Sequence, residues 1–179
     1  MIKAFQIIYH KRSGCRYKIM NPKIIVGEKA PDFTLISHSG KKVRLLDLIN
    51  KKNIVLYFYP KDDSVGCTRE ACAFRNNYQI FKNVGAEVVG VSSDDVKTHR
   101  NFVSKYNLPF VLLSDEEKKI RKLYGATSRI GLIPVRITYI IDKKGIVRNI
   151  FKSQLKTKKH VDNAIEVLEN IQKNLEDVS

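Results

Sequence analysis

Residues 53–75, NIVLYFYPKDDSVGCTREACAFR, decide the fold of this chain. The stretch opens with an apolar run rich in β-branched and aromatic residues, which predicts a strand over residues 53–59 that is buried on both faces. Pro60 ends this strand, because proline has no N–H to donate to a sheet. After a short polar loop, a helical pattern begins near Gly66 and predicts a helix over residues 66–83.

Cys67 falls in the first turn of this predicted helix, directly after a buried strand and a short loop. The first N–H groups of a helix lack partners within it, and the helix dipole adds roughly half a positive charge there. Both favour a thiolate, and a cysteine so placed can have its pKa lowered from about 8.5 to roughly 3.5–7.5. The alternative is that Cys67 is a small buried apolar residue. A second cysteine, Cys72, follows five residues later.

The surroundings of Cys67 resemble a known enzyme family. The pattern P-x-x-x-[TS]-x-x-C is written here as PKDDSVGC, residues 60–67, and resembles the active-site loop of the peroxiredoxins, which are cysteine-dependent peroxidases. Its continuation GCTREAC, residues 66–72, resembles the peroxiredoxin Q or bacterioferritin-comigratory subgroup. Two more stretches are similar in the same order: GEKAPDFTL (27–35) resembles the family's opening, and GLIPVRITYIID (131–142) its late strand with the active-site arginine.

This resemblance covers roughly residues 24–170 and implies a thiol peroxidase for hydrogen peroxide and alkyl hydroperoxides, with no cofactor and no metal. It implies that Cys67 is the peroxidatic nucleophile and becomes a sulfenic acid. Cys72 would resolve that sulfenic acid into an intramolecular disulfide, which thioredoxin or a similar reductant would reduce. The alternative for Cys72 is a buried helix cysteine.

The resemblance gives catalytic roles to three further residues. Arg136 would supply a fixed positive charge to the thiolate and the peroxide, the Ser64 hydroxyl would hydrogen-bond the peroxide, and Pro60 would shield the sulfur from water. The alternatives are a surface cation for Arg136 and an ordinary loop hydroxyl for Ser64. Ser64 stands where the family usually has threonine, and Val65 stands where this subgroup usually has proline. Serine keeps the hydroxyl, so we expect activity to survive, whereas the missing proline should loosen the loop.

Four charged residues near the cysteines are interpreted as surface groups. Arg69 and Glu70 lie on the predicted helix and are expected to face solvent. Asp62 and Asp63 are expected to serve solubility and partner docking rather than the chemistry.

Strands that alternate with helices predict a three-layer α/β sandwich with a mixed central sheet, which agrees with the thioredoxin-like fold that the resemblance implies. We expect strands over residues 33–36, 42–44, 53–59, 86–92, 110–113, 135–141 and 146–151, and helices over residues 45–50, 66–83, 94–106, 114–124 and 157–175. Asp94 is the expected N-cap of one helix, and Ser114 with Glu117 forms an expected capping box for the next. The last pair of strands predicts an antiparallel edge.

The bulk composition is that of one globular domain, which we place at residues 24–179. Three cysteines are too few for a disulfide-stapled secreted scaffold. No apolar run approaches the roughly 20 residues that span a bilayer, so no membrane association is expected. The cysteines and His10 do not have a zinc-site spacing.

Residues 1–23 form a basic N-terminal arm with six Lys or Arg residues and no acid. This composition suits an organelle-targeting segment, although serine is scarce; the alternative is a disordered or loosely packed arm. A plastid or another organelle is our first expectation for the compartment, with cytoplasm or nucleus as alternatives. Cys15 in the arm is interpreted as a dispensable thiol.

The net charge of +15 suggests three explanations: a nucleic-acid partner, an anionic surface, or compositional drift. Most lysine pairs fall at expected turns and helix ends, so solvated faces explain them best, and nucleic acid is a possible but not an expected partner. A disulfide oxidoreductase is disfavoured because Cys-x-x-Cys is absent. We expect a monomer.

Overall fold

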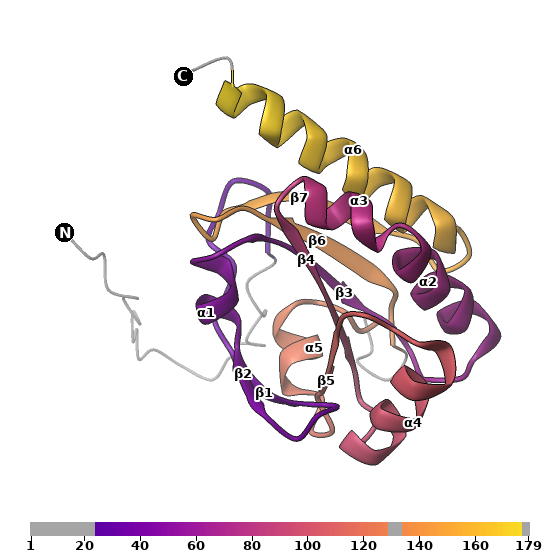
Figure 1. Ribbon diagram of the computed structural model, residues 1–179. Helices are drawn as coiled ribbons and strands as arrows, with labels where there is room; N and C mark the ends of the chain where they lie inside the picture. The colour runs from indigo at the N-terminus through magenta and orange to yellow at the C-terminus, as the bar shows by residue number, and fades with distance from the viewer. Residues whose placement is uncertain (1–23, 129–133, 177–179) are drawn as a thin grey trace, which may run out of the picture.

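The computed structural model describes residues 24–128 and 134–176, with side chains as far as Lys173. Its elements, in chain order, are β1 (Thr34–Ser37), β2 (Lys42–Arg44), α1 (Leu45–Ile49), β3 (Asn53–Phe58), α2 (Val65–Asn76), α3 (Tyr78–Asn83), β4 (Ala86–Ser92), α4 (Val96–Tyr106), β5 (Val111–Ser114), α5 (Lys119–Leu123), β6 (Ile137–Ile141), β7 (Val147–Lys152) and α6 (Thr157–Glu176) (Figure 1). The expectations for residues 1–23, including Cys15, lie outside the described residues.

The strands form one mixed sheet in the order β2-β1-β5-β4-β3-β6-β7. The β3–β4 and β4–β5 pairs are parallel, whereas β6 and β7 pair antiparallel to each other and β6 pairs antiparallel to β3. The predicted parallel centre and antiparallel late edge are therefore confirmed. Helices cover both faces of the sheet, which is the predicted three-layer sandwich.

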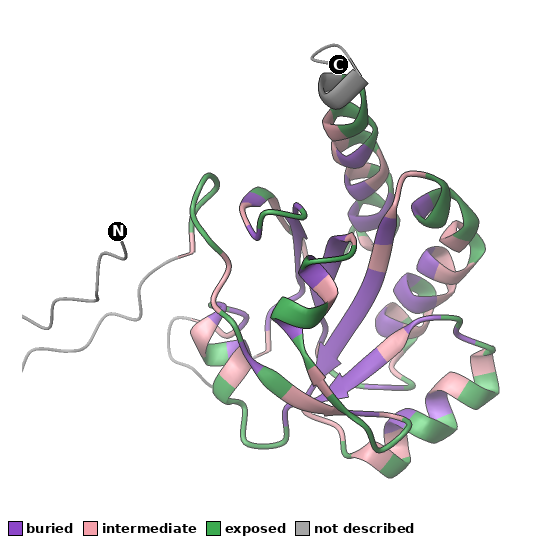
Figure 2. Ribbon diagram, turned by 60° about the vertical axis from the view of Figure 1, so that its left-hand side comes forward, coloured by how far each residue is buried: buried purple, intermediate pink, exposed green. Residues whose placement is uncertain are grey.

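Strand β3 lies at the centre of the sheet, and all six of its residues are buried. Its side chains alternate between two hydrophobic cores, because successive residues of a strand point to opposite faces. Val55 and Tyr57 pack with residues of α2, α3, α4 and α6, whereas Leu56 and Phe58 pack with residues of α1 and Tyr124 at the end of α5. Figure 2 shows the result: the central strands are buried, and the helices are buried mainly on their inner sides.

The predicted helix over residues 66–83 is divided in two at Asn77, between α2 and α3. The Asn77 side-chain amide donates to the carbonyl of Ala73 at 2.9 Å, which competes with regular backbone pairing. The prediction of a single helix was wrong at this residue. The apolar side chains on both sides of Asn77 face the core, so their spacing gave no sign that the helix breaks there.

The predicted cap of α4 was wrong by one residue. Asp95, not Asp94, is the N-cap and accepts from the backbone N–H of Thr98 at 2.7 Å. The Asp94 carboxylate instead accepts from the Ser92 hydroxyl at 2.6 Å and from the backbone N–H of Asp62 at 2.9 Å. It therefore ties the end of β4 to the loop that precedes Cys67.

The predicted capping box at Ser114 was also wrong. Helix α5 begins later, at Lys119, and has no side-chain cap. The Ser114 hydroxyl donates to the Asp94 carbonyl at 2.6 Å, and the Asp115 carboxylate accepts from the N–H groups of Ile120 and Arg121. A neighbouring carboxylate thus takes the role that the pattern gave to the serine.

The register of β3 against β6 brings two distant motifs together. Phe58 at the end of β3 is paired with Ile137 at the start of β6. Arg136 therefore lies at the edge of the sheet from which the loop to Cys67 departs.

Candidate active site

Cys67 lies in the first turn of α2 and is almost fully buried, with 1% of its surface exposed. The helix starts at Val65 with Ser64 in extended conformation at its N-cap position, and Thr68 donates to the Ser64 carbonyl at 2.8 Å. The predicted place of Cys67 is confirmed. The sulfur therefore lies near the unpaired N–H groups at the start of a 12-residue helix, where the helix dipole is positive. Both features favour a thiolate.

Arg136 is the cation beside this sulfur. Its Nη2 lies 3.4 Å from the Cys67 Sγ, and only 3% of the residue is exposed. The backbone N–H of Arg136 donates to Gln154 Oε1 at 3.2 Å, which fixes the start of β6. Burial alone would lower the pKa of Arg136, but the carboxyl of Glu70 and the Cys67 sulfur raise it overall. The guanidinium therefore stays charged in a buried site.

Gly66 leaves room for this guanidinium. A Cβ at Gly66 would lie 3.1 Å from Arg136 Nη2, closer than ordinary van der Waals contact. A side chain here would push Arg136 away from the sulfur.

Glu70 is not the surface residue that the sequence suggested. It is fully buried, and one of its oxygens, Oε2, accepts a hydrogen bond from Arg136 Nη1. Burial raises the pKa of Glu70 to about 8, against the opposing effect of Arg136. The helical spacing could have indicated that Glu70 is buried. Glu70 lies three residues after Cys67, on the same buried face of the helix as Ala71 and Phe74.

Behind Glu70 lies a buried histidine that the sequence analysis missed. The Nδ1 atom of His160, on α6, lies 3.7 Å from Glu70 Oε1 and accepts a hydrogen bond from the Thr138 hydroxyl at 2.7 Å. Its Nε2 donates to the Ser153 carbonyl at 2.9 Å, and burial lowers its pKa to about 4, so the ring is neutral. His160 could have been found from its spacing, because it lies four residues before the buried Ala164 of the same helix.

Ser64 and Pro60 flank the loop that leads to Cys67, and both are half-buried. The Ser64 hydroxyl donates to the Lys61 carbonyl at 3.1 Å, so its only proton is already engaged. Lone pairs of its oxygen remain free to accept. The structure thus brings Cys67 and Arg136 into contact and places Ser64 and Pro60 on the adjoining loop.

Asp62, expected at the surface, is buried and anchors this loop. Its carboxylate accepts from the Tyr59 hydroxyl at 2.7 Å and lies 2.7 Å from Nδ1 of His99 on α4. Asp63 and Arg69 are exposed, as expected. Although Val65 stands where proline is usual, the buried Asp62 three residues earlier fixes this loop through Tyr59 and His99.

Cys72 lies in the same continuous helix as Cys67 and is half-buried, and both thiols are free. Residues five apart in a regular helix have Cα atoms ~8.6 Å apart. A disulfide needs Cα atoms within about 6.8 Å. The two sulfurs therefore cannot bond while α2 keeps this form.

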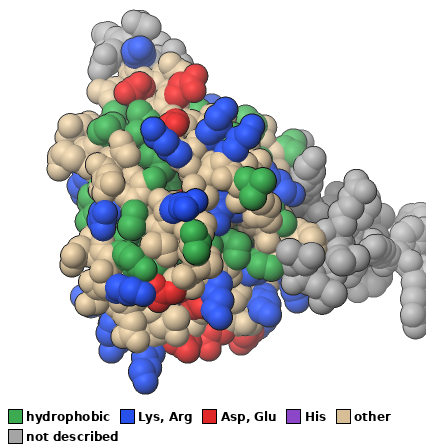
Figure 3. Space-filling view, turned by 90° about the vertical axis from the view of Figure 1, so that its right-hand side faces the viewer, with side chains coloured by type: hydrophobic (Ala, Val, Ile, Leu, Met, Phe, Trp, Pro, Cys, Tyr) green, Lys and Arg blue, Asp and Glu red, His purple; other side chains and the backbone are tan. Residues whose placement is uncertain are grey.

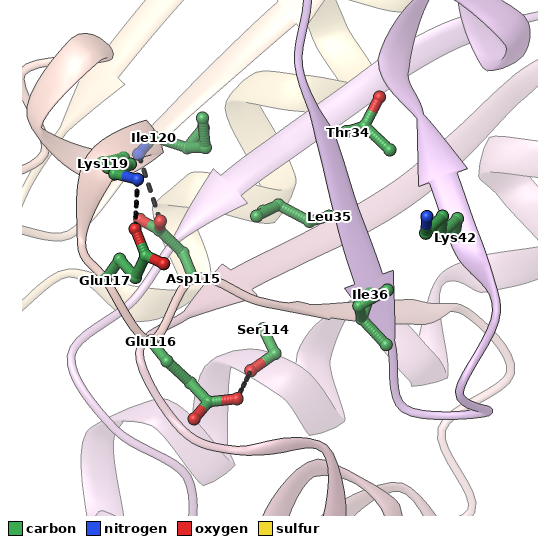
Figure 4. Close-up of a pocket in the computed structure, with 10 residues that line it drawn as sticks. All are labelled: Thr34, Leu35, Ile36, Lys42, Ser114, Asp115, Glu116, Glu117, Lys119 and Ile120. Carbon is green, nitrogen blue, oxygen red and sulfur yellow. Dashed lines mark hydrogen bonds and ion pairs between the residues drawn. The ribbon is translucent and has the colours of Figure 1, made fainter.

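Several surface pockets formed by described residues lie outside this sulfur site. A pocket of about 610 Å³ is formed by the β1–β2 hairpin and the β5–α5 segment, and its lining includes Leu35, Ile36, Asp115 and Glu116 (Figure 4). None of the proposed catalytic residues line it. A second pocket, of about 270 Å³, borders Pro60 and Arg121.

Comparisons with known proteins identify the family of this chain. The AhpC/TSA family matches residues 26–150. Chloroplastic peroxiredoxin Q of Triticum aestivum is 43% identical over 162 residues, which cover 90% of this chain and 74% of the relative. The Arabidopsis thaliana protein of the same name is 47% identical and covers 82% of this chain and 68% of the relative. The chain belongs to the peroxiredoxin Q group of the AhpC/TSA family.

Solved structures support the same assignment of this peroxiredoxin. Peroxidoxin BcpB from Mycobacterium tuberculosis superimposes with a TM-score of 0.77 at 33% identity, covering 82% of this chain and 97% of that one. Peroxiredoxin Q of Xanthomonas campestris gives a TM-score of 0.71 at 28% identity, covering 78% and 91%. The predicted fold and family are therefore confirmed.

The peroxiredoxin is a thiol-dependent peroxidase, and the family implies peroxide substrates and a thioredoxin-type reductant. The curated relatives named above are chloroplast proteins, which supports a plastid as the compartment. In the described part of the chain, no helix has the length and apolar character of a membrane span, and no cluster of His, Cys, Asp or Glu could hold a metal ion.

Glu70→Gln is expected to change the pH dependence of this peroxiredoxin. Glu70 is protonated below about pH 8 and ionised above it, and its carboxylate then competes with the thiolate for the charge of Arg136. The rate of Cys67 oxidation by hydrogen peroxide should therefore fall in the wild type as the pH rises above 8, and should stay level in Glu70→Gln. Stopped-flow rates from pH 6 to 10 provide the measurement, with Glu166→Gln, on α6, as the control. Equal profiles for wild type and Glu70→Gln would refute this role.

Proposed function

We propose that Cys67 is the nucleophile that attacks the peroxide and that Arg136 activates it. The observation that supports this is the 3.4 Å contact between Arg136 Nη2 and Cys67 Sγ in a buried site. The thiolate attacks one peroxide oxygen, an S–O bond forms, the O–O bond breaks, and the second oxygen leaves as hydroxide or alkoxide and takes up a proton. The fixed guanidinium stabilises charge on both the sulfur and the leaving oxygen.

Ser64 and Pro60 would position the peroxide. Because the Ser64 hydroxyl gives its proton to the Lys61 carbonyl, its oxygen is placed to accept a hydrogen bond from the peroxide O–H. The N–H groups of Gly66 and Cys67 would donate to the peroxide, and Pro60 would exclude water from the sulfur.

Cys72 would resolve the sulfenic acid of Cys67, and this requires the first turns of α2 to unwind. The buried Glu70 side chain, paired with Arg136, holds these turns in the reduced form. Unwinding must therefore also separate this ion pair. After resolution, the product is an intramolecular disulfide that a thioredoxin-like reductant opens.

An oxidation experiment tests this resolving step. Oxidised wild-type protein should run as a monomer on a non-reducing gel, contain a Cys67–Cys72 disulfide, and show faster hydrogen exchange over residues 68–73. Cys72→Ser should stop after one turnover with thioredoxin, whereas the control Cys15→Ser should turn over normally. An unchanged exchange rate in the oxidised wild type, or full turnover of Cys72→Ser, would make this a one-cysteine enzyme resolved by an external thiol.

The chain would be a monomer without a nucleic-acid partner. On the face drawn in Figure 3, Lys and Arg side chains are spread out, with hydrophobic side chains among them and acidic side chains toward the top and bottom of the view. A nucleic-acid site would instead need a contiguous basic footprint. A steep fall of DNA affinity with salt would contradict this part of the proposal.

Residues 24–179 would form the catalytic domain, and the basic arm over residues 1–23 would be dispensable for it. The matched family region begins at residue 26. A chain without residues 1–22 is expected to keep the peroxidase rate and the thermal midpoint of the full chain. Unfolding of the shortened chain would show that the arm is part of the domain.

A further inference from the structure

The pocket of about 270 Å³ beside the catalytic loop is lined by an unusual set of polar groups. Three of the lining side chains are cations, Lys61, Lys118 and Arg121, and one is a carboxylate, Asp94. The Asp94 carboxylate is already engaged by the Ser92 hydroxyl and by a backbone N–H. Among the described residues, the ammonium groups of Lys61 and Lys118 have no ion-pair partner. The pocket therefore has an excess of positive charge.

Arg121 gives this pocket a buried donor without an acceptor. Only 3% of the residue is exposed, and its Nη2 donates to the Tyr59 carbonyl at 2.7 Å. Its Nε is buried and has no hydrogen-bond partner in the described part of the chain, and the same holds for the hydroxyl of Ser93, which also lines the pocket. Buried polar groups are nearly always satisfied in folded proteins, so the Arg121 guanidinium beside this pocket keeps unused donor capacity.

The chemistry of the lining selects an oxyanion. A guanidinium and two ammonium groups supply many donors and positive charge, which suit a carboxylate. The pocket is close in size to the lower range of small-molecule sites, so it offers more space than hydrogen peroxide needs.

Two consecutive residues, Tyr59 and Pro60, connect this pocket with the loop that leads to Cys67. Pro60 lines the pocket and begins the loop that leads to Cys67, and Arg121 holds the carbonyl of Tyr59 just before it. The positive charge of Arg121 also interacts favourably with the Cys67 sulfur. Pro60 is therefore shared by the pocket and the loop that carries Cys67.

We propose that this pocket binds the carboxylate of an organic hydroperoxide whose O–O bond is broken at Cys67. The inference rests on the proposed role of Cys67. The carboxylate takes no part in the redox step: the thiolate becomes a sulfenic acid, the hydroperoxide becomes an alcohol, and the carboxylate leaves unchanged with the alcohol.

The test compares two forms of one substrate with the full chain. The probes are para-carboxycumene hydroperoxide and its methyl ester, which differ in charge but carry the same peroxide group. Stopped-flow rates of Cys67 oxidation should be about tenfold higher for the acid than for the ester at low salt, and the difference should shrink as salt is added. Benzoate should slow the reaction of the acid.

Variants assign the effect to the pocket. The ratio of the acid rate to the ester rate should fall several-fold in Lys118→Gln and approach one in the double variant Lys61→Gln/Lys118→Gln. Lys97→Gln removes an exposed lysine of α4 and should keep the wild-type ratio. Arg121→Lys, checked for folding by its thermal midpoint, should lower the ratio of the acid rate to the ester rate. A lysine ammonium cannot bind a carboxylate with two parallel N–H groups as the planar guanidinium does.

The outcomes separate this inference from the function on which it rests. A wild type that fails to react with hydrogen peroxide would refute the role of Cys67. A wild type that reacts with hydrogen peroxide but treats acid and ester alike would refute the pocket alone. A ratio that survives in the double variant would also refute it, since the discrimination would then arise elsewhere.

Discussion

Replacing Cys67 by serine is expected to abolish peroxidase activity. Serine has nearly the size of cysteine, so the buried first turn of α2 should keep its packing. Its hydroxyl is not ionised near neutral pH and cannot attack a peroxide as a thiolate does. NADPH consumption with thioredoxin, thioredoxin reductase and hydrogen peroxide measures the loss, which should reach the background of the assay.

The control for this variant is Cys15→Ser, which should retain wild-type turnover. Circular dichroism and the thermal midpoint should show that Cys67→Ser is folded. Turnover of Cys67→Ser at even about a tenth of the wild-type rate would mean that the nucleophile is another residue.

Arg136→Ala is expected to slow Cys67 oxidation by about 10²–10³-fold, the usual effect of removing one preorganised charge-stabilising donor. Alkylation of the Cys67 sulfur should slow as well, because the guanidinium 3.4 Å away that favours the thiolate is lost. Stopped-flow rates with hydrogen peroxide measure the first effect, and the rate of thiol alkylation measures the second.

Two further variants separate this effect from simple misfolding. Arg136→Ala leaves Glu70 buried without its partner, although Glu70 can stay protonated because its pKa is about 8. The double variant Arg136→Met/Glu70→Gln removes that problem and should be as slow as Arg136→Ala. Arg69→Ala, on the exposed side of the same helix, should react at the wild-type rate. An unchanged rate in Arg136→Ala would show that the contact with Cys67 has no catalytic role.

Much of the fold could be predicted because its signals are local. The apolar run over residues 53–59, rich in β-branched and aromatic residues, favoured a strand buried on both faces, and the alternation of strands with helices predicted the parallel centre of the sheet. Cys67 and Arg136 could be paired from the sequence only through the resemblance to a family, since 68 residues separate them. The register of β3 with β6 supplies the physical reason for their contact.

The residues that were missed are buried polar groups with distant partners. Glu70, Asp62 and His99 look like surface residues in a sequence, because each becomes buried only when another element supplies its partner. Helical spacing gave a hint, since Glu70 shares a face with Cys67 and His99 lies one turn before Phe102. Charge is a weak guide to exposure where a tertiary partner can satisfy it.

The most direct test of this account is to identify the atom that peroxide oxidises first. The double variant Cys15→Ser/Cys72→Ser retains Cys67 as its one cysteine and cannot form an intramolecular disulfide. One equivalent of hydrogen peroxide in the presence of dimedone, followed by peptide mass spectrometry, shows where a sulfenic acid forms. We expect one dimedone adduct, on Cys67, and its near absence when Arg136→Ala is added. Peroxide consumption without an adduct on Cys67 would contradict this expectation.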